Sequence, residues 1–191
     1  MSPLAVWLVV LAVAAFGGLL RFFRLGEPDA VVFDETYYVK DAWTMLQTGE
    51  PRDWPDTMDW NGASVNPNIP FAAGDTDHWL SSAEYVVHPP FGKGLIALGL
   101  KLFGGASHPF AWRAATAIAG TVAIIILMRV ILPLWHSLSI AVLGGTLMAI
   151  DGVGITLSRT GLLDVFITAL ALGAFQLLLM HRDWARERLW R

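Results

Sequence analysis

The chain has 191 residues, of which 55% are hydrophobic and 15% are charged, and its mean hydropathy is +0.54. Soluble domains carry about a quarter charged residues, so this composition argues against that class, and it is too apolar for a disordered chain. The formal net charge of -3 gives no indication of nucleic-acid binding. The absence of cysteine excludes disulfides, thiolate metal sites and a cysteine nucleophile. An integral membrane protein is therefore expected.

Four stretches are long and apolar enough to cross a bilayer as helices, which takes about 20 residues each. They cover approximately residues 3–20, 112–132, 134–157 and 162–180, and Asp151 interrupts the third. The first also resembles a signal peptide, because Ala12-Val13-Ala14 is typical of a cleavage site. No Lys or Arg precedes it and three spans follow, so we interpret it as an uncleaved helix.

The positions of the arginines predict the orientation in the membrane. The tail after the fourth span contains Arg182, Arg186, Arg188 and Arg191. Basic flanks favour the cytoplasm, so the tail and, with four spans, the N-terminus are both placed there. The polar loop of residues 21–111 then faces outside. Arg21 and Arg24 oppose this orientation because they lie just beyond the first span, where snorkelling or contact with a lipid phosphate would account for them.

Residues 33–46 predict a helix with two adjacent carboxylates at its start. Asp34 is a suitable N-cap, Gly49 is a suitable stop, and apolar residues recur at helical spacing. As a functional site, Asp34 and Glu35 would form an acid/base pair at the membrane edge that takes a proton from a hydroxyl during group transfer. As local structure, they are a cap and a dipole-favoured acid, which is the reading that the dipeptide alone favours.

A second helix is predicted from His88 to about Phe103, with prolines in its first turn. Lys93, Ala97 and Lys101 lie on one polar stripe, which favours a helix in the membrane interface. His88 and Lys93 either contact a phosphate or pyrophosphate, or serve as a hydrogen-bonding loop residue and a head-group anchor. The sequence leaves both interpretations open.

Three charged residues lie beside the predicted spans, where a charge is costly and is therefore a functional candidate. Arg113 begins the second span and either binds a lipid phosphate through its guanidinium or snorkels to the interface. Arg159 and Asp164 flank the outer turn between the third and fourth spans. They are expected to pair, either lining an outer cavity or joining two helices.

The segment Asp75-Thr76-Asp77 is similar to a two-carboxylate metal motif, and His78 would complete the ligand set. That motif belongs to nucleotide-binding α/β domains, and the chain shows no alternation of strands and helices. A solvated loop is the favoured interpretation, and no metal is expected.

The motifs together resemble the protein O-mannosyltransferase family, and most closely its bacterial, actinobacterial-type members. The resemblance rests on Asp34-Glu35, His88-Pro89-Pro90-Phe91-Gly92-Lys93, Arg113 and Ser158-Arg159-Thr160-Gly161-Leu162-Leu163-Asp164, in the order of the family. It covers nearly the whole chain. Many lipid-dependent glycosyltransferases share the Asp-Glu pair, whereas its combination with the histidine motif and the following arginine is specific.

The resemblance implies an all-α integral membrane protein with the GT-C glycosyltransferase fold. Residues 1–191 would be its N-terminal, four-span part, with a large first extracytoplasmic loop that contains interfacial helices. Family members are much longer, so the chain is expected to be a fragment whose activity alone is doubtful. The implied location is the plasma membrane, with several spans and an active site on the extracytoplasmic side.

The implied activity is transfer of mannose from polyprenyl-phosphate mannose to Ser or Thr hydroxyls of exported proteins. Membrane lipid and the Sec translocon are the further expected partners, and no cofactor is implied beyond the lipid-linked donor. The implied catalytic residues are Asp34 and Glu35, and the implied substrate-binding residues are His88, Lys93, Arg113, Arg159 and Asp164. For Arg159 and Asp164 the role is structural or site-supporting.

The expected chemistry is an inverting transfer with Asp34 as general base. Because an aspartate is a weak base, removal of the acceptor proton is expected to be concerted with departure of the lipid phosphate. Positioning would carry most of the catalysis, with the developing charge stabilised by Arg113 and Lys93.

Three alternatives stay open at the level of sequence. One is a different GT-C enzyme that glycosylates a lipid or a polysaccharide. Another is a transporter or channel subunit, which the clustering of polar residues at the outer edge argues against. The third is a non-catalytic membrane subunit that assists assembly.

Overall fold

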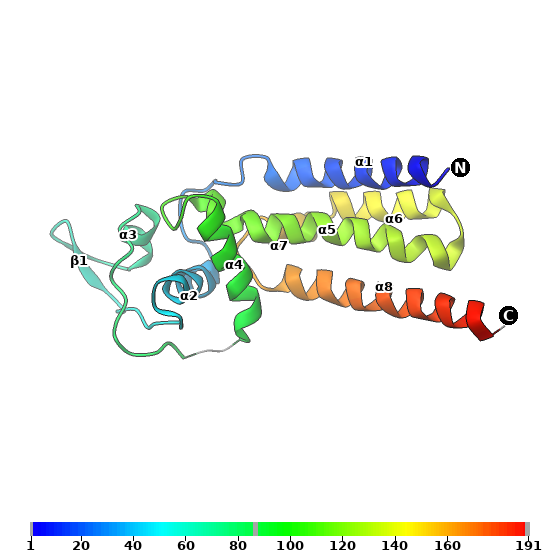
Figure 1. The fold of residues 1–191 in the computed structure, drawn as a ribbon. Helices are drawn as coiled ribbons and strands as arrows, with labels where there is room; N and C mark the ends of the chain where they lie inside the picture. The colour runs from blue at the N-terminus through cyan, green and yellow to red at the C-terminus, as the bar shows by residue number, and fades with distance from the viewer. Residues whose placement is uncertain (1, 86–87, 190–191) are drawn as a thin grey trace. The chain divides into compact units, whose positions relative to one another are not determined.

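The computed structural model describes residues 2–85 and 88–189, and this part of the chain is mostly helical (Figure 1). It divides into two compact units. The first, which we call the span unit, contains residues 2–23, 117–156 and 164–189. The second, the loop unit, contains the described residues of 24–116 together with 157–163. The predicted helical membrane class agrees with this architecture.

Among the described residues, three helices are long and apolar enough to cross a membrane. They are α1 (Pro3–Phe22), α5 (Pro109–Trp135) and α8 (Asp164–Leu189). The predicted third span consists of two helices, α6 (Leu138–Ile150) and α7 (Gly152–Ser158), bent by 60° at the break. Asp151 explains the bend, because its backbone is extended and its carboxylate accepts a 2.6 Å hydrogen bond from the Gly154 N–H, as an N-cap does.

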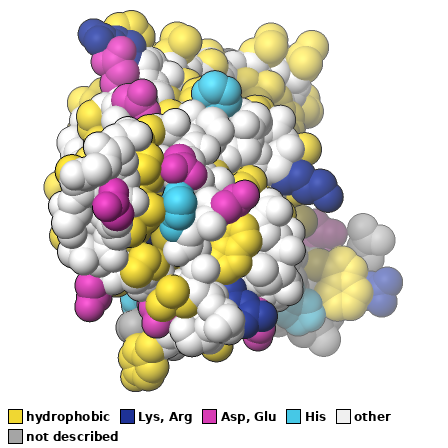
Figure 2. All heavy atoms as spheres, turned by 90° about the vertical axis from the view of Figure 1, so that its left-hand side faces the viewer, with side chains coloured by type: hydrophobic (Ala, Val, Ile, Leu, Met, Phe, Trp, Pro, Cys, Tyr) yellow, Lys and Arg dark blue, Asp and Glu magenta, His cyan; other side chains and the backbone are white. Residues whose placement is uncertain are grey.

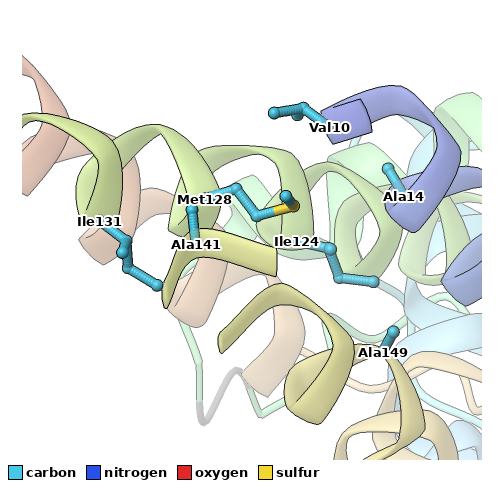
Figure 3. Packing of buried hydrophobic residues seen from close by; sticks show 7 residues of the cluster. All are labelled: Val10, Ala14, Ile124, Met128, Ile131, Ala141 and Ala149. Atoms are coloured by element: carbon cyan, nitrogen blue, oxygen red, sulfur yellow. The ribbon is translucent and has the colours of Figure 1, made fainter. Parts of the chain in front are cut away.

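Three helices of the span unit pack through small and aliphatic side chains (Figure 3). The buried cluster contains Val10 and Ala14 of α1, Ile124, Met128 and Ile131 of α5, and Ala141 and Ala149 of α6. Alanines at these positions let helix backbones approach closely, which is how helices associate in lipid. Many large apolar side chains on the outer surfaces of the same helices are exposed, as expected of a lipid-facing surface.

Arg21 lies inside α1 rather than beyond its end, and its side chain is only 1% exposed. Its guanidinium donates hydrogen bonds to the carbonyls of Gly17 (3.0 Å), Ala149 (3.2 Å) and Met148 (3.3 Å). A cation at the C-terminal carbonyls of α6 also interacts favourably with the helix dipole. Arg21 thus joins α1 to α6. The predicted orientation of the chain stays a prediction, and Arg191, on which it partly rests, lies outside the described residues.

The loop unit contains α2 (Glu35–Thr48), α3 (Asn68–Ala72), α4 (Pro90–Leu102) and a short antiparallel pair of strands, β1 (Met58–Trp60) and β2 (Ala63–Val65). The strands are an addition to the predicted all-α class. Asn61 and Gly62 connect them with positive φ angles of 53° and 79°. An Asn-Gly pair favours this kind of two-residue turn.

The two helices predicted in the loop are confirmed. Asp34 occupies the N-cap position of α2, and Gly49 ends the helix with a φ of 88°. The α4 helix begins at Pro90, in agreement with proline in the first turn. The polar stripe predicted on α4 is wrong, because α4 packs against α2 and buries Lys93 and Ala97, whereas Lys101 is exposed.

Candidate functional site

A cavity of about 340 Å³ inside the loop unit brings together three of the predicted site residues, Asp34, His88 and Lys93. The remaining lining residues are Tyr37, Tyr38, Asp41, Glu84 and Tyr85. We call it the reaction cavity. Acidic side chains lie among apolar and uncharged ones over the face of the molecule drawn in Figure 2. The carboxylates, phenols, histidine and lysine that line the reaction cavity suit a polar substrate with several hydroxyl groups.

Asp34 stands at the start of α2 with its side chain half-buried. Its backbone is helical (φ -72°, ψ -2°), and its carboxylate makes no capping hydrogen bond to the first turn. The residue therefore occupies the N-cap position without using its side chain as a cap. That leaves the carboxylate oxygens available to the reaction cavity, which they line.

Lys93 and Asp41 form a buried ion pair between α4 and α2. The Lys93 Nζ donates to the Asp41 Oδ2 at 2.5 Å, and the two side chains are 2% and 3% exposed. Burial raises the pKa of Asp41, while the hydrogen bond and the charge of Lys93 oppose that rise. Lys93 thus reaches the reaction cavity with a carboxylate partner already in place.

His88 lies directly before α4 and is exposed. Its ring meets the ring of Tyr38 edge to face, with centroids 5.5 Å apart and planes at 72°. Pro89 and Pro90 restrict the backbone between His88 and the helix. The histidine is therefore held at the rim of the reaction cavity by an aromatic contact and a stiff backbone.

Glu35 is fully buried and accepts four hydrogen bonds. Two come from Arg113, from Nε to Oε1 at 2.7 Å and from Nη2 to Oε2 at 2.9 Å. The other two come from backbone N–H groups, that of Gly161 to Oε1 at 2.8 Å and that of Val32 to Oε2 at 3.0 Å. All four donors therefore lie outside α2, in three other segments of the loop unit.

Arg113 is 1% exposed and uses every N–H of its guanidinium inside the protein. Beyond Glu35, it donates to the carbonyls of Leu25 (3.3 Å), Pro28 (3.0 Å) and Ala30 (2.9 Å). A guanidinium has five N–H groups, and five hydrogen bonds account for all of them. The structure thus places Glu35 and Arg113 against each other. Their predicted roles in catalysis and phosphate binding stay predictions.

The segment of residues 158–163 reaches Glu35 through the backbone of Gly161. A Cβ added at Gly161 would stand 2.9 Å from Val39 Cγ2 and 3.3 Å from the Trp112 carbonyl oxygen, so a glycine is required for this approach. Arg159 is half-buried, and its Nη2 donates to the carbonyl of Arg24 at 3.3 Å. Asp164 is exposed in the first turn of α8, in the span unit. The predicted pairing of Arg159 with Asp164 stays a prediction.

Asp75 belongs to a separate group of polar residues. It lies 2.8 Å from the Nε2 atom of His78, and its carboxylate accepts a hydrogen bond from the Trp60 indole at 3.2 Å. Within residues 2–85 and 88–189, no three His, Asp or Glu side chains have an arrangement that would hold a metal ion.

Sequence reasoning missed Tyr37, Asp41 and Glu84 as lining residues. Two of them carried a detectable signal, because Tyr37 and Asp41 follow Asp34 at i+3 and i+7, on the same face of a helix. Glu84 lies in an irregular segment and had no such signal.

Nearly the whole chain is similar to proteins named polyprenol-phosphate-mannose–protein mannosyltransferase. It is 32% identical over 187 residues to that of Mycolicibacterium smegmatis, covering 96% of this chain and 31% of the relative. It is 31% identical over 186 residues to that of Mycobacterium tuberculosis, covering 96% of this chain and 30% of the relative. It is 32% identical over 185 residues to that of Corynebacterium glutamicum, covering 97% of this chain and 31% of the relative. No family model and no solved structure matches the chain.

The chain therefore spans about three-tenths of the length of the curated relatives that it matches. The resemblance to protein mannosyltransferases that the sequence motifs predicted is confirmed. The relatives are glycosyltransferases by name, and their names specify a lipid-linked mannose donor and a protein acceptor.

Proposed function

We propose that this chain transfers mannose from polyprenyl-phosphate mannose to Ser or Thr hydroxyls of exported proteins, at the extracytoplasmic face of the cell membrane. One observation carries the proposal. Asp34, whose carboxylate makes no capping hydrogen bond, lines a polar cavity of about 340 Å³ in a chain whose relatives are named for this reaction. The size is sufficient for a hexose together with the hydroxyl of an acceptor.

In the proposed reaction, the acceptor oxygen forms a bond to C1 of mannose as the bond from C1 to the phosphate oxygen breaks. The acceptor proton moves to the Asp34 carboxylate, and the electron pair leaves with the polyprenyl phosphate. Attack from the face opposite the phosphate inverts the configuration at C1. Proton transfer and departure of the leaving group are concerted because an aspartate is a weak base.

The surrounding residues have separate roles in this scheme. His88, exposed at the rim, donates a hydrogen bond to the sugar or to the leaving phosphate. Lys93 binds there together with its partner Asp41, so its contribution is a directed N–H rather than an isolated charge. Glu35 and Arg113 act as positioning residues that hold the first turn of α2 in place. Arg159 and Asp164 keep a site-supporting role.

The same proposal places the loop unit outside the cell, where an exported polypeptide emerges from the Sec translocon. The donor lipid lies in the bilayer with its sugar at the surface. The scheme uses no metal and no cofactor: hydrogen bonds from His88 and Lys93 stabilise the charge that develops on the leaving phosphate.

The test uses membranes that contain the full gene product, labelled polyprenyl-phosphate mannose and a threonine-containing peptide. Wild-type membranes are expected to label the peptide, and Asp34→Asn to lower the rate by roughly 10²–10⁴-fold, the usual contribution of a general base. Asp29→Asn, at an exposed position outside the reaction cavity, serves as the matched control and should leave the rate unchanged. Unchanged labelling in Asp34→Asn refutes the catalytic assignment, and label found only in lipid or polysaccharide supports the alternative GT-C enzyme.

A further inference from the structure

A second cavity of about 300 Å³ adjoins the reaction cavity within the loop unit. Tyr37, Asp41 and Glu84 line both cavities. Six further residues carry the polar and aromatic character of the second one: Lys40, Asp53, Trp54, Asp56, Asn66 and Thr36. A molecule that occupied both would therefore pass directly from the second cavity to Asp34.

Lys40 is the distinctive residue of the second cavity. Its side chain is 9% exposed, yet within the described residues its ammonium makes no hydrogen bond and no ion pair shorter than 4 Å. The Nζ atom lies over the ring of Trp54, 5.1 Å from the centroid. Burial lowers the pKa of Lys40, and Glu84, Asp41 and Asp53 oppose that effect. The buried stem of Lys40 thus brings an ammonium with unused N–H donors to the cavity wall, where a ligand that supplies a lone pair would accept from it.

The other charges of this cavity are carboxylates. Asp53, Asp56 and Glu84 line the cavity together with the one ammonium of Lys40, and Asp41 is already paired with Lys93. Burial and the neighbouring carboxylates of Asp41 and Asp53 raise the pKa of Glu84. A phosphate group would be repelled here, because like charges in close contact are destabilising. The donor lipid is thus an unsuitable occupant, and the ligand is expected to be neutral or cationic with both acceptors and donors.

The two aromatic residues of this cavity differ in exposure: Tyr37 is 57% exposed, whereas Trp54 offers a sugar no open ring face. Sugars usually bind by stacking on an open aromatic face, whereas Trp54 is only 9% exposed. Its ring packs edge to face against Phe71 and Trp79, with centroids 5.6 Å and 6.3 Å away, and Lys40 lies over it. A polypeptide in extended conformation, in contrast, offers carbonyls to an ammonium and N–H groups to carboxylates.

We propose that the second cavity binds the acceptor polypeptide beside the Ser or Thr to be modified, with Lys40 donating to a peptide carbonyl. Asp53 and Asp56 would favour neutral or basic side chains next to the modified residue and disfavour acidic ones. The inference rests on the proposed function, since it names where the acceptor of that reaction lies. We call this second cavity the acceptor cavity.

The experiment measures peptide binding without donor, so that it does not depend on turnover. Three fluorescent threonine peptides, identical except for a neutral, lysine or aspartate neighbour, are titrated against the full gene product in nanodiscs. The aspartate peptide is expected to bind roughly tenfold more weakly than the lysine peptide. Lys40→Met should weaken binding of the neutral peptide about tenfold or more, which corresponds to the loss of one hydrogen bond to a charged group. Lys101→Met, an exposed lysine on α4 outside both cavities, is the matched control.

Asp56→Asn provides a second variant at an exposed position, where misfolding is not a concern. It should reduce the preference for the lysine over the aspartate peptide while leaving the neutral peptide unchanged. Equal binding of all three peptides, or unchanged binding in Lys40→Met, overturns the inference. Charge-dependent binding without any mannose transfer would retain the acceptor cavity and reject the proposed reaction, so the two failures are distinguishable.

Discussion

The adjacent acids Asp34 and Glu35 are expected to respond in opposite ways to truncation. Glu35→Ala removes a carboxylate that accepts four hydrogen bonds, two of them from Arg113 and two from the backbone N–H groups of Val32 and Gly161. Asp34→Ala removes a half-buried carboxylate that caps nothing. The first change should open the loop unit, and the second should leave its stability intact while abolishing catalysis.

The magnitude follows from the burial of the pair. Glu35 is 0% and Arg113 is 1% exposed, and removing one partner of a buried ion pair costs about 3–5 kcal/mol. Arg113 keeps three carbonyl acceptors, which favours the lower half of that range. At about 1.4 kcal/mol for each factor of ten, the population of opened loop unit should rise roughly 100- to 1,000-fold. Asp34→Ala should change it by less than about threefold, as expected away from buried contacts.

Amide hydrogen exchange followed by mass spectrometry measures this directly, on the full gene product in nanodiscs. Peptides containing Val32 and Gly161 should lose protection in Glu35→Ala by the stated factor, and peptides from the middle of α1 should not. The exchange rate of Glu35→Gln should lie between those of the wild type and Glu35→Ala, because glutamine keeps one acceptor oxygen but turns an amide N–H toward Arg113. If Glu35→Ala exchanges at the wild-type rate and still loses activity, the positioning role is refuted and a direct catalytic role is favoured.

The remaining predictions concern the ion pair, the glycines and the acidic wall of the acceptor cavity. Asp41→Asn should lower the thermal midpoint, because it leaves the Lys93 ammonium buried without its counter-charge. The double variant Asp41→Leu with Lys93→Met should recover most of this loss, since apolar replacement of both partners of a buried ion pair is tolerated. Gly161→Ala should destabilise by about 1–3 kcal/mol through overpacking. In contrast, Gly94→Ala, where an added Cβ meets nothing within 4 Å in α4, should stabilise by about 0.5–1 kcal/mol. Because the pKa of Glu84 is raised above its ordinary 4.5, its contribution to stability is present below pH 4.5 and is lost as pH rises through the folded-state pKa. The thermal midpoint of the wild-type protein should therefore fall as pH rises over that interval, and the midpoint of Glu84→Gln should depend less on pH.

The helices of the loop unit could be predicted because their boundaries are encoded locally. Asp34 at the start of α2, Gly49 at its end and Pro90 at the start of α4 each act on the backbone of their own turn. The Asn61-Gly62 turn carried an equally local signal for a two-stranded hairpin. The prediction of an all-α chain missed the hairpin because the strands on either side of the turn are only three residues long.

The partners of the charged residues could not be predicted, because they depend on contacts between distant segments. Arg113 and Glu35 are 78 residues apart in sequence, and Lys93 and Asp41 are 52 apart. The polar stripe on α4 illustrates the same limit. Helical spacing places Lys93 and Lys101 on one face, but the position of α2 determines that Lys93 is buried and Lys101 exposed.

The division of labour between the two acids follows from helix geometry. Successive residues of a helix point about 100° apart, so neighbours cannot face the same surroundings. Glu35 turns toward Arg113, whereas Asp34 shares its face with Tyr37 and Asp41 and lines the reaction cavity. To accept a proton from a substrate, Glu35 would first have to break hydrogen bonds to donors that are themselves buried, but Asp34 breaks no cap. The four bonds of Glu35 instead fix the turn from which Asp34 projects, and a general base needs that fixed placement because catalysis falls when the reacting groups are misplaced by about 1 Å.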